Sequence, residues 1–66
     1  MIQRFLRRRE VESITGLPRS SLYDLMKAGR FPKPVPLNDE GHAVAWVESD
    51  IAEWQEERIA KREATA

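Results

Sequence analysis

The chain has no cysteine and no long hydrophobic run. Without cysteine it can form neither disulfides nor a thiolate metal cluster, so side-chain packing alone must hold the fold. No stretch approaches the roughly 20 apolar residues of a membrane span, and the first residues lack the apolar run of a signal peptide. The sequence therefore predicts a cytoplasmic protein with no membrane partner.

The chain is also short, with 66 residues. This length suits one domain, which we expect to span residues 1–66, with a core at 5–60 and a flexible tail at 63–66. A domain of this size buries only about 60% of the surface that its unfolded chain exposes. A deep enzyme cavity is not expected in so small a core, and we predict no enzymatic activity, small-molecule substrate, cofactor or metal.

The chain as a whole has no excess of positive or negative charge, but each half of it has one. The formal net charge is zero, but residues 1–33 carry eight Lys and Arg against three Asp and Glu, whereas residues 34–66 carry three against eight. The two halves therefore have charges of +5 and −5. Such a field would turn the amino-terminal half toward a polyanion such as nucleic acid and the other half away from it.

Among the features that the sequence does have, the most informative is the segment of residues 15–34, TGLPRSSLYDLMKAGRFPKP. Gly16 can adopt the positive φ that ends a helix, and Pro18 has a φ suited to the start of the next one. Two helices are therefore expected to meet here at an angle. The second has about nine residues and ends at Gly29, and its apolar stripe consists of Leu22, Leu25 and Met26.

The preceding segment predicts a first helix over residues 8–15. Val11 and Ile14 are spaced by three residues and are expected to face the core, and Leu6 packs just ahead of the helix. No good N-cap residue precedes this helix, so its start is weakly defined by the sequence.

The segment after the second helix predicts a hairpin and a third helix. Prolines exclude a helix over residues 31–46, and apolar residues alternate at period two in 35–37 and 44–46, which indicates two strands. Ser49 is expected to cap the last helix. The predicted fold is α+β but mostly α: a winged helix-turn-helix with three helices and a two-stranded β-hairpin wing between helices 2 and 3. The apolar line of the third helix consists of Ile51, Trp54 and Ile59.

Four blocks occur in order and at compatible spacing: Thr-Gly-Leu at 15–17, Arg-Ser-Ser-Leu-Tyr at 19–23, Gly-Arg-Phe-Pro-Lys-Pro-Val at 29–35, and Trp46 with Glu-Ser-Asp-Ile at 48–51 and Trp54. With these blocks, the chain from Leu6 to Trp54 resembles the AlpA-like regulators of prophages and related mobile elements. Their fold is similar to that of phage excisionases and of the DNA-binding domain of MerR regulators.

This resemblance implies a non-enzymatic protein that binds double-stranded DNA sequence-specifically in the bacterial cytoplasm, where it is nucleoid-associated when bound. It also implies two uses that the sequence does not separate, as an excisionase (recombination directionality factor) and as a transcriptional regulator. An integrase and further copies of the protein on DNA are the partners expected for these uses. A different class of function stays open, a small protein-interaction module or inhibitor that uses the acidic third helix.

The candidate DNA-binding residues surround the start of the second helix. Arg19, Ser20 and Ser21 lie at the end that points toward base edges when such a helix enters the major groove. Arg19 can form a forked contact with guanine, whereas the serine hydroxyls suit a base, a phosphate or a local cap. Tyr23 is either a phosphate contact or a half-buried core residue. The basic candidates for phosphate contacts are Arg7, Arg8, Arg9, Lys27, Arg30 and Lys33.

Several residues have plainer interpretations. Arg7 to Arg9 also suit a solubilising patch, although a basic run before a helix-turn-helix is well placed for phosphates. Trp46 and Trp54 have core spacing and are interpreted as core residues rather than as base-stacking residues. His42 is interpreted as part of a solvated turn, not a metal site. The acidic tip of the wing opposes phosphate, so the wing either contacts DNA through its stem near Lys33 or stands clear.

Overall fold

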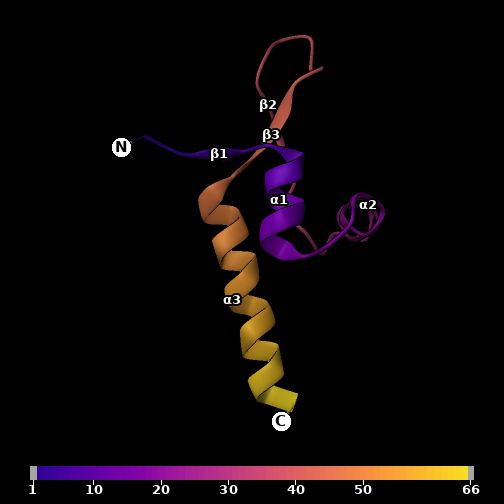
Figure 1. Ribbon diagram of the computed structural model, residues 1–66, viewed down its shortest axis with the longest axis vertical. Coiled ribbons are helices and arrows are strands. Elements are labelled where there is room, and N and C mark those ends of the chain that lie inside the picture. Colours follow the sequence, from indigo (N-terminus) through magenta and orange to yellow (C-terminus); the bar gives the residue numbers. More distant parts are fainter. Residues whose placement is uncertain (1, 66) are drawn as a thin grey trace.

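The computed structural model describes residues 2–65. In chain order its elements are β1 (Phe5–Leu6), α1 (Arg8–Thr15), α2 (Arg19–Lys27), β2 (Val35–Pro36), β3 (Val44–Val47) and α3 (Glu48–Thr65). In Figure 1, α1 lies between α2 and α3, and the β2–β3 hairpin projects beyond the end of α1. The protein is mostly helical α+β and fits a winged helix-turn-helix, which confirms the predicted fold class.

Helix α1 has the predicted bounds, and a hydrogen bond from a backbone N–H caps it at each end. At its start the carboxylate of Glu10 accepts a hydrogen bond of 3.0 Å from the backbone N–H of Arg7. This acidic residue in the first turn supplies the cap that the residues before the helix do not. At its end Gly16 has a φ of +75°, and its N–H donates to the carbonyl of Glu12 at 2.9 Å.

Helix α2 also has the predicted nine residues. Pro18 precedes it with an extended backbone and a φ of −73°. At the other end Gly29 has a φ of +74°, and the N–H of Arg30 donates to the carbonyl of Leu25 at 2.8 Å. This is the six-to-one hydrogen bond of a glycine-terminated helix, so both glycines have their predicted roles.

The sheet has three strands where two were predicted. The strand order is β1–β3–β2 and both pairings are antiparallel, with Leu6 opposite Trp46 and Val35 opposite Ala45. The pairing of β1 is extended by a 2.8 Å hydrogen bond from the N–H of Glu48 to the carbonyl of Arg4. The prediction missed β1 because two residues are too few to show an alternating pattern.

One hydrophobic core contains a residue from nearly every helix and strand. Its buried members are Leu6, Val11, Leu22, Phe31, Trp46 and Ile51. The side chains of Leu17, Leu25, Met26 and Trp54 are partly buried against them. This cluster fixes α2 against α1 and the sheet, which determines the direction in which the outer face of α2 points.

Two residues predicted to face the core do not. Ile14 is 47% exposed, whereas the next residue, Thr15, is half-buried and its hydroxyl donates to the carbonyl of Val11 at 2.7 Å. Ile59 is 50% exposed, because the second half of α3 extends past the other helices (Figure 1). At 18 residues, this helix is about 27 Å long.

Helix α3 differs from the prediction at both ends. It begins at Glu48, directly after β3, so Ser49 lies inside the helix rather than capping it. It continues to Thr65, so residues 63–65 of the predicted tail are helical, and residue 66 lies outside the described residues. None of the helices described is both long and apolar enough to cross a membrane.

The two tryptophans hold the segment that follows α2. The indole N–H of Trp46 donates to the carbonyl of Pro32 at 2.9 Å, and that of Trp54 donates to the carbonyl of Arg30 at 3.1 Å. Phe31 meets Trp54 edge to face, with ring centroids 5.0 Å apart. These contacts confirm that both tryptophans belong to the core, and they anchor the end of α2.

Candidate nucleic-acid interface

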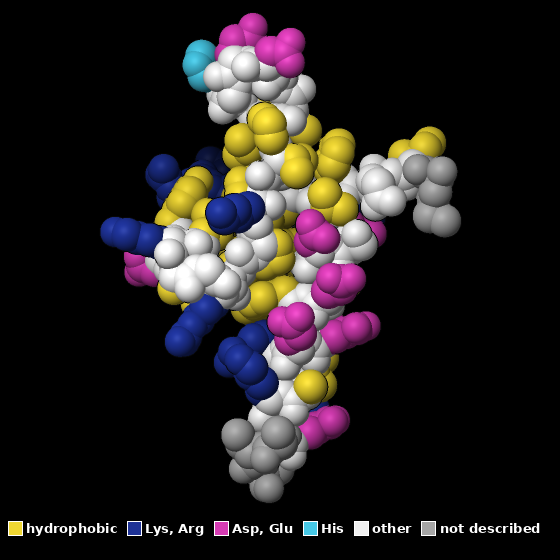
Figure 2. Space-filling model, turned by 180° about the vertical axis from the view of Figure 1, so that it is seen from behind, with side chains coloured by type: hydrophobic (Ala, Val, Ile, Leu, Met, Phe, Trp, Pro, Cys, Tyr) yellow, Lys and Arg dark blue, Asp and Glu magenta, His cyan; other side chains and the backbone are white. Residues whose placement is uncertain are grey.

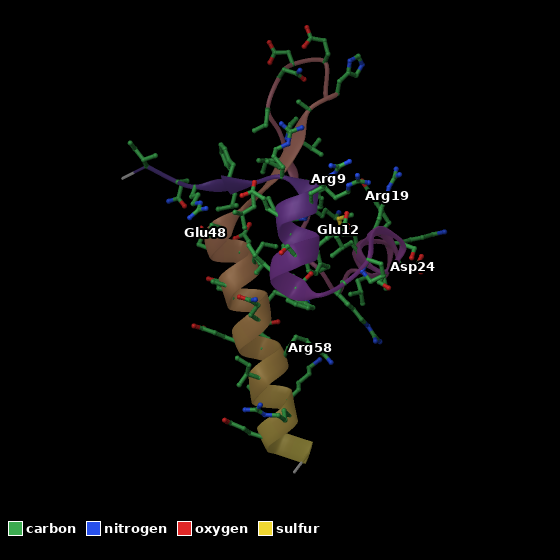
Figure 3. The ribbon with its side chains drawn as sticks, viewed as in Figure 1. Arg9, Glu12, Arg19, Asp24, Glu48 and Arg58 are labelled. Atoms are coloured by element: carbon green, nitrogen blue, oxygen red, sulfur yellow. The ribbon has the colours of Figure 1, made fainter. Side chains whose placement is uncertain are left out.

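Helix α2 turns one face to the core and the other to solvent. Leu22 is fully buried, whereas Ser20, Asp24 and Lys27, at helical spacing on the opposite face, are exposed. In Figure 3, Asp24 projects on the side of α2 away from α1. The sequence analysis did not single out Asp24, although its position four residues after Ser20 and three before Lys27 places it on this face.

Arg19 and Tyr23 form one unit at the amino-terminal end of α2. The guanidinium carbon of Arg19 lies 5.5 Å from the centroid of the Tyr23 ring, which is close enough for a cation–π contact. Tyr23 is 44% exposed. Its hydroxyl forms no hydrogen bond within the described part of the chain, so its polar end is available to a ligand.

The two serines beside Arg19 do not cap the helix. The N-cap position belongs to Pro18, and no side chain forms a capping hydrogen bond there. Ser20 is exposed and Ser21 is half-buried. At this helix end Ser20 is therefore open to solvent and Ser21 only partly so, and the first backbone N–H groups have no side-chain cap.

A groove on one side of α2 gathers the basic run of the amino terminus. It has a volume of about 370 Å³. We call it the wing-side groove, and its lining residues are Arg7, Arg8, Arg9, Tyr23, His42 and Val44. Figure 3 shows Arg9 at the end of α1 nearest the wing. The three arginines are thus brought against α2 and the hairpin, and Arg8 is also paired with Glu12 at 3.2 Å.

His42 has a different setting from the predicted one. Its residue is exposed, as expected for a turn, but it also lines the wing-side groove beside the arginines. Sequence reasoning could not place it there, because the position depends on how the hairpin folds over the start of α1. Residues 2–65 contain no group of three His, Asp or Glu side chains that could hold a metal ion.

A second groove lies between α2 and α3. It has a volume of about 590 Å³. We call it the α3-side groove, and its lining residues are Leu17, Leu25, Arg30, Trp54, Glu57, Arg58 and Lys61. Arg58 and Lys61 lie in the half of the chain with a net charge of −5, so the charge count did not point to them. Their spacing in the sequence could have predicted this position. Arg58 and Lys61 follow Trp54 by four and seven residues, which places the three side chains on one face of α3.

Lys33 lies outside the two grooves and shares its surroundings with one other predicted basic residue, Arg30. It lines a third depression, of about 430 Å³, to which α3 contributes Asp50, Glu53 and Glu57. These carboxylates lower the local positive potential, so Lys33 has a weaker attraction for phosphate than the arginines of the wing-side groove.

The charge separation inferred from the two halves of the sequence is visible on the surface. Figure 2 shows Asp and Glu side chains along α3 and at the tip of the wing, and Lys and Arg side chains over α2 and between α2 and α3. The fold and this surface together define a small winged helix-turn-helix protein with basic residues around its second helix.

The comparisons with known proteins identify the family. The model of the family described as "Prophage CP4-57 regulatory protein (AlpA)" matches residues 4–59, so the chain belongs to this prophage regulatory family. The chain is also similar to "Uncharacterized protein ORF88" of Enterobacteria phage P4, with 45% identity over 60 residues. That alignment covers 91% of this chain and 66% of the phage protein, so the chain spans about two thirds of its relative's length. No solved structure matches the chain.

Proposed function

We propose that the protein binds DNA sequence-specifically in a prophage or integrative element, as an excisionase (recombination directionality factor), a transcriptional regulator, or both. The observation that carries this proposal is the exposed amino-terminal end of α2, where Arg19 lies against Tyr23 beside the arginines of the wing-side groove. Membership of a prophage regulatory family supports it.

In this proposal α2 enters the major groove, whose width of about 12 Å matches the diameter of a helix with its side chains. Arg19 donates two hydrogen bonds to guanine O6 and N7, and Ser20 and Ser21 contact bases or phosphates. The remaining contacts are to the phosphate backbone and set the register of the protein on the duplex. They are made by Arg7, Arg8, Arg9, Tyr23, Lys27, Arg30 and Lys33.

Excision and transcriptional regulation would use the same DNA-binding surface of the protein. They differ in where the bound DNA sequence lies in the element. A single short helix in the groove buries little surface, so useful affinity requires neighbouring copies on the DNA. As an excisionase, the protein would bind near the attachment sites and direct a partner integrase toward excision. As a regulator, it would bind a promoter of the element while associated with the bacterial nucleoid.

One observation favours a second candidate function, a protein-interaction module. Exposed carboxylates follow α3, where Glu53, Glu56 and Glu57 face solvent without an ion pair in the described part of the chain. Such a surface suits a basic partner. In this alternative α3, rather than α2, would carry the binding energy.

Footprinting across both ends of the element and its promoters tests the proposal. We expect discrete protected sites with wild-type protein and clearly weaker protection with Arg19→Ala at the same protein concentration. The triple variant Glu53→Ala/Glu56→Ala/Glu57→Ala is expected to keep the protection. Loss of protection in the triple variant, together with full protection by Arg19→Ala, would contradict the proposal. An excision assay with the adjacent integrase then separates the two uses of the same sites.

A further inference from the structure

Two basic grooves flank α2 on opposite sides. Tyr23 lines the wing-side groove and Leu25 lines the α3-side groove. Residues two apart on a helix point about 200° away from each other, so the two grooves lie on different sides of α2. The α3-side groove is also lined by Leu17, which precedes α2, and by Arg30, which follows it.

A helix in the major groove has a phosphate backbone on each side. The helix with its side chains is about 10–12 Å across, and the groove is about 12 Å wide, so both strands come within reach of the flanks of α2. The wing-side groove offers arginines to one strand. The side chains that line the α3-side groove are the ones that meet the other strand.

The charge of the α3-side groove suits phosphate. Its lining has three cationic side chains, Arg30, Arg58 and Lys61, against one carboxylate, Glu57. In the neighbouring depression that holds Lys33, by contrast, carboxylates outnumber cations. Of the two surfaces beside the end of α2, the α3-side groove therefore has the stronger attraction for a polyanion.

Arg58 is the cation of this groove that is best placed to reach a ligand. It is exposed, and it forms no ion pair within the described part of the chain. Figure 3 shows its side chain extending from α3 toward the side on which α2 lies. The guanidinium therefore keeps all of its hydrogen-bond donors available to a phosphate.

We propose that Arg58, together with Arg30, binds the phosphate backbone of one DNA strand while the arginines of the wing-side groove bind the other. This inference rests on the proposed function and deepens it. It assigns DNA contact to a residue in the half of the chain with a net charge of −5. Helix α3 then turns toward DNA the face that carries Arg58 and Lys61 together with Glu57.

The salt dependence of DNA binding tests the proposal with a matched pair of variants. Arg58→Ala is expected to weaken binding of an element-end duplex about three- to tenfold and to lower the slope of log affinity against log salt by about 0.9. Arg58→Lys keeps the charge and is expected to keep the slope. Arg4→Ala is the control, because it removes the same charge from β1, where Arg4 pairs with Glu48 at 3.2 Å. We expect the control to stay within twofold of wild type.

Phosphate ethylation interference locates the contact. Wild-type protein is expected to show two clusters of interfering phosphates, one on each strand, flanking the bases read by α2. Arg58→Ala should lose one cluster and Arg9→Ala the other. Unfolding by urea checks that each variant is folded, and Arg58→Gln serves as a second variant if alanine destabilises α3.

The outcomes separate this inference from the proposed function. If the wild-type protein does not bind element DNA, the proposed function fails first. If the wild type binds and Arg19→Ala weakens binding as expected, the inference alone is overturned when Arg58→Ala matches Arg4→Ala in slope and keeps both ethylation clusters.

Discussion

The guanidinium of Arg19 lies over the ring of Tyr23, 5.5 Å from its centroid. Arg19 is the first residue of α2, and Tyr23 is one turn further along the helix. The ring restricts the conformations of a long side chain that would otherwise move freely in solvent, so less conformational entropy is lost when the guanidinium binds a ligand. This contact makes Arg19 the best-prepared candidate for reading a base.

Arg19→Ala should therefore reduce affinity for the element's site roughly 5- to 150-fold, because one bidentate contact to guanine is worth about 1–3 kcal/mol. Arg19→Lys separates charge from geometry, since lysine keeps the charge but lacks the planar fork. We expect the lysine variant to retain nonspecific affinity and to lose discrimination. Fluorescence anisotropy with cognate and scrambled duplexes measures both quantities. Equal discrimination by wild type and Arg19→Lys would remove Arg19 from base recognition.

Tyr23→Phe distinguishes the two interpretations of the tyrosine. The ring contact with Arg19 survives this change, and the hydroxyl has no hydrogen-bond partner in the described part of the protein. The free energy of unfolding should therefore be unchanged. If the hydroxyl contacts a phosphate, DNA affinity falls about 2- to 10-fold, as for loss of one hydrogen bond. We expect this fall. Unchanged affinity, measured in the same anisotropy assay, would leave Tyr23 with a packing role only.

Much of the helix-turn-helix could be predicted from residues close together in the sequence. Gly16, Pro18 and Gly29 impose backbone conformations locally, so the bounds of α1 and α2 and the turn between them follow from the residue types alone. Strand β1 could not be predicted in this way. It exists because Leu6 pairs with Trp46, 40 residues away, and such a pairing leaves no local pattern.

The candidate site was predictable in part for the same reason. The turn sets the position of the residues at the start of α2, of which Arg19 and Ser20 are exposed, and their contact with DNA stays a prediction. The two grooves depend on distant elements, since the wing-side groove needs the hairpin beside α1 and the α3-side groove needs Trp54 against the end of α2. Charge counted along the chain groups Arg58 with the acidic half and cannot show the carboxylates around Lys33, because both settings depend on how α3 packs beside the end of α2.

The difference in burial between two residues of α1 predicts how much each contributes to the free energy of unfolding. Val11 is fully buried and Ile14 is 47% exposed, although both are β-branched and lie on the same helix. Val11→Ala should lower the free energy of unfolding by about 2 kcal/mol, from lost burial and the cavity left behind. Ile14→Ala should cost less than about 1 kcal/mol, although it removes more atoms. Urea denaturation of the two variants measures both values, and the reverse order would contradict the orientation of α1.

The turn between α1 and α2 gives the last prediction, at Gly16. Its φ of +75° is unfavourable for an L-residue, while a Cβ at this position would meet nothing within 4 Å. Gly16→Ala should therefore cost about 1–2 kcal/mol from backbone strain alone. D-alanine at the same position, introduced by chemical synthesis, favours positive φ and reduces the entropy of the unfolded chain, so it should stabilise the protein by about 0.4–1 kcal/mol. Thermal and urea unfolding compare the three proteins. If L-alanine and D-alanine at position 16 lower the free energy of unfolding equally, the loss of stability arises from steric contact. Glycine would then not be required at this position by the positive φ of the turn that orients α2.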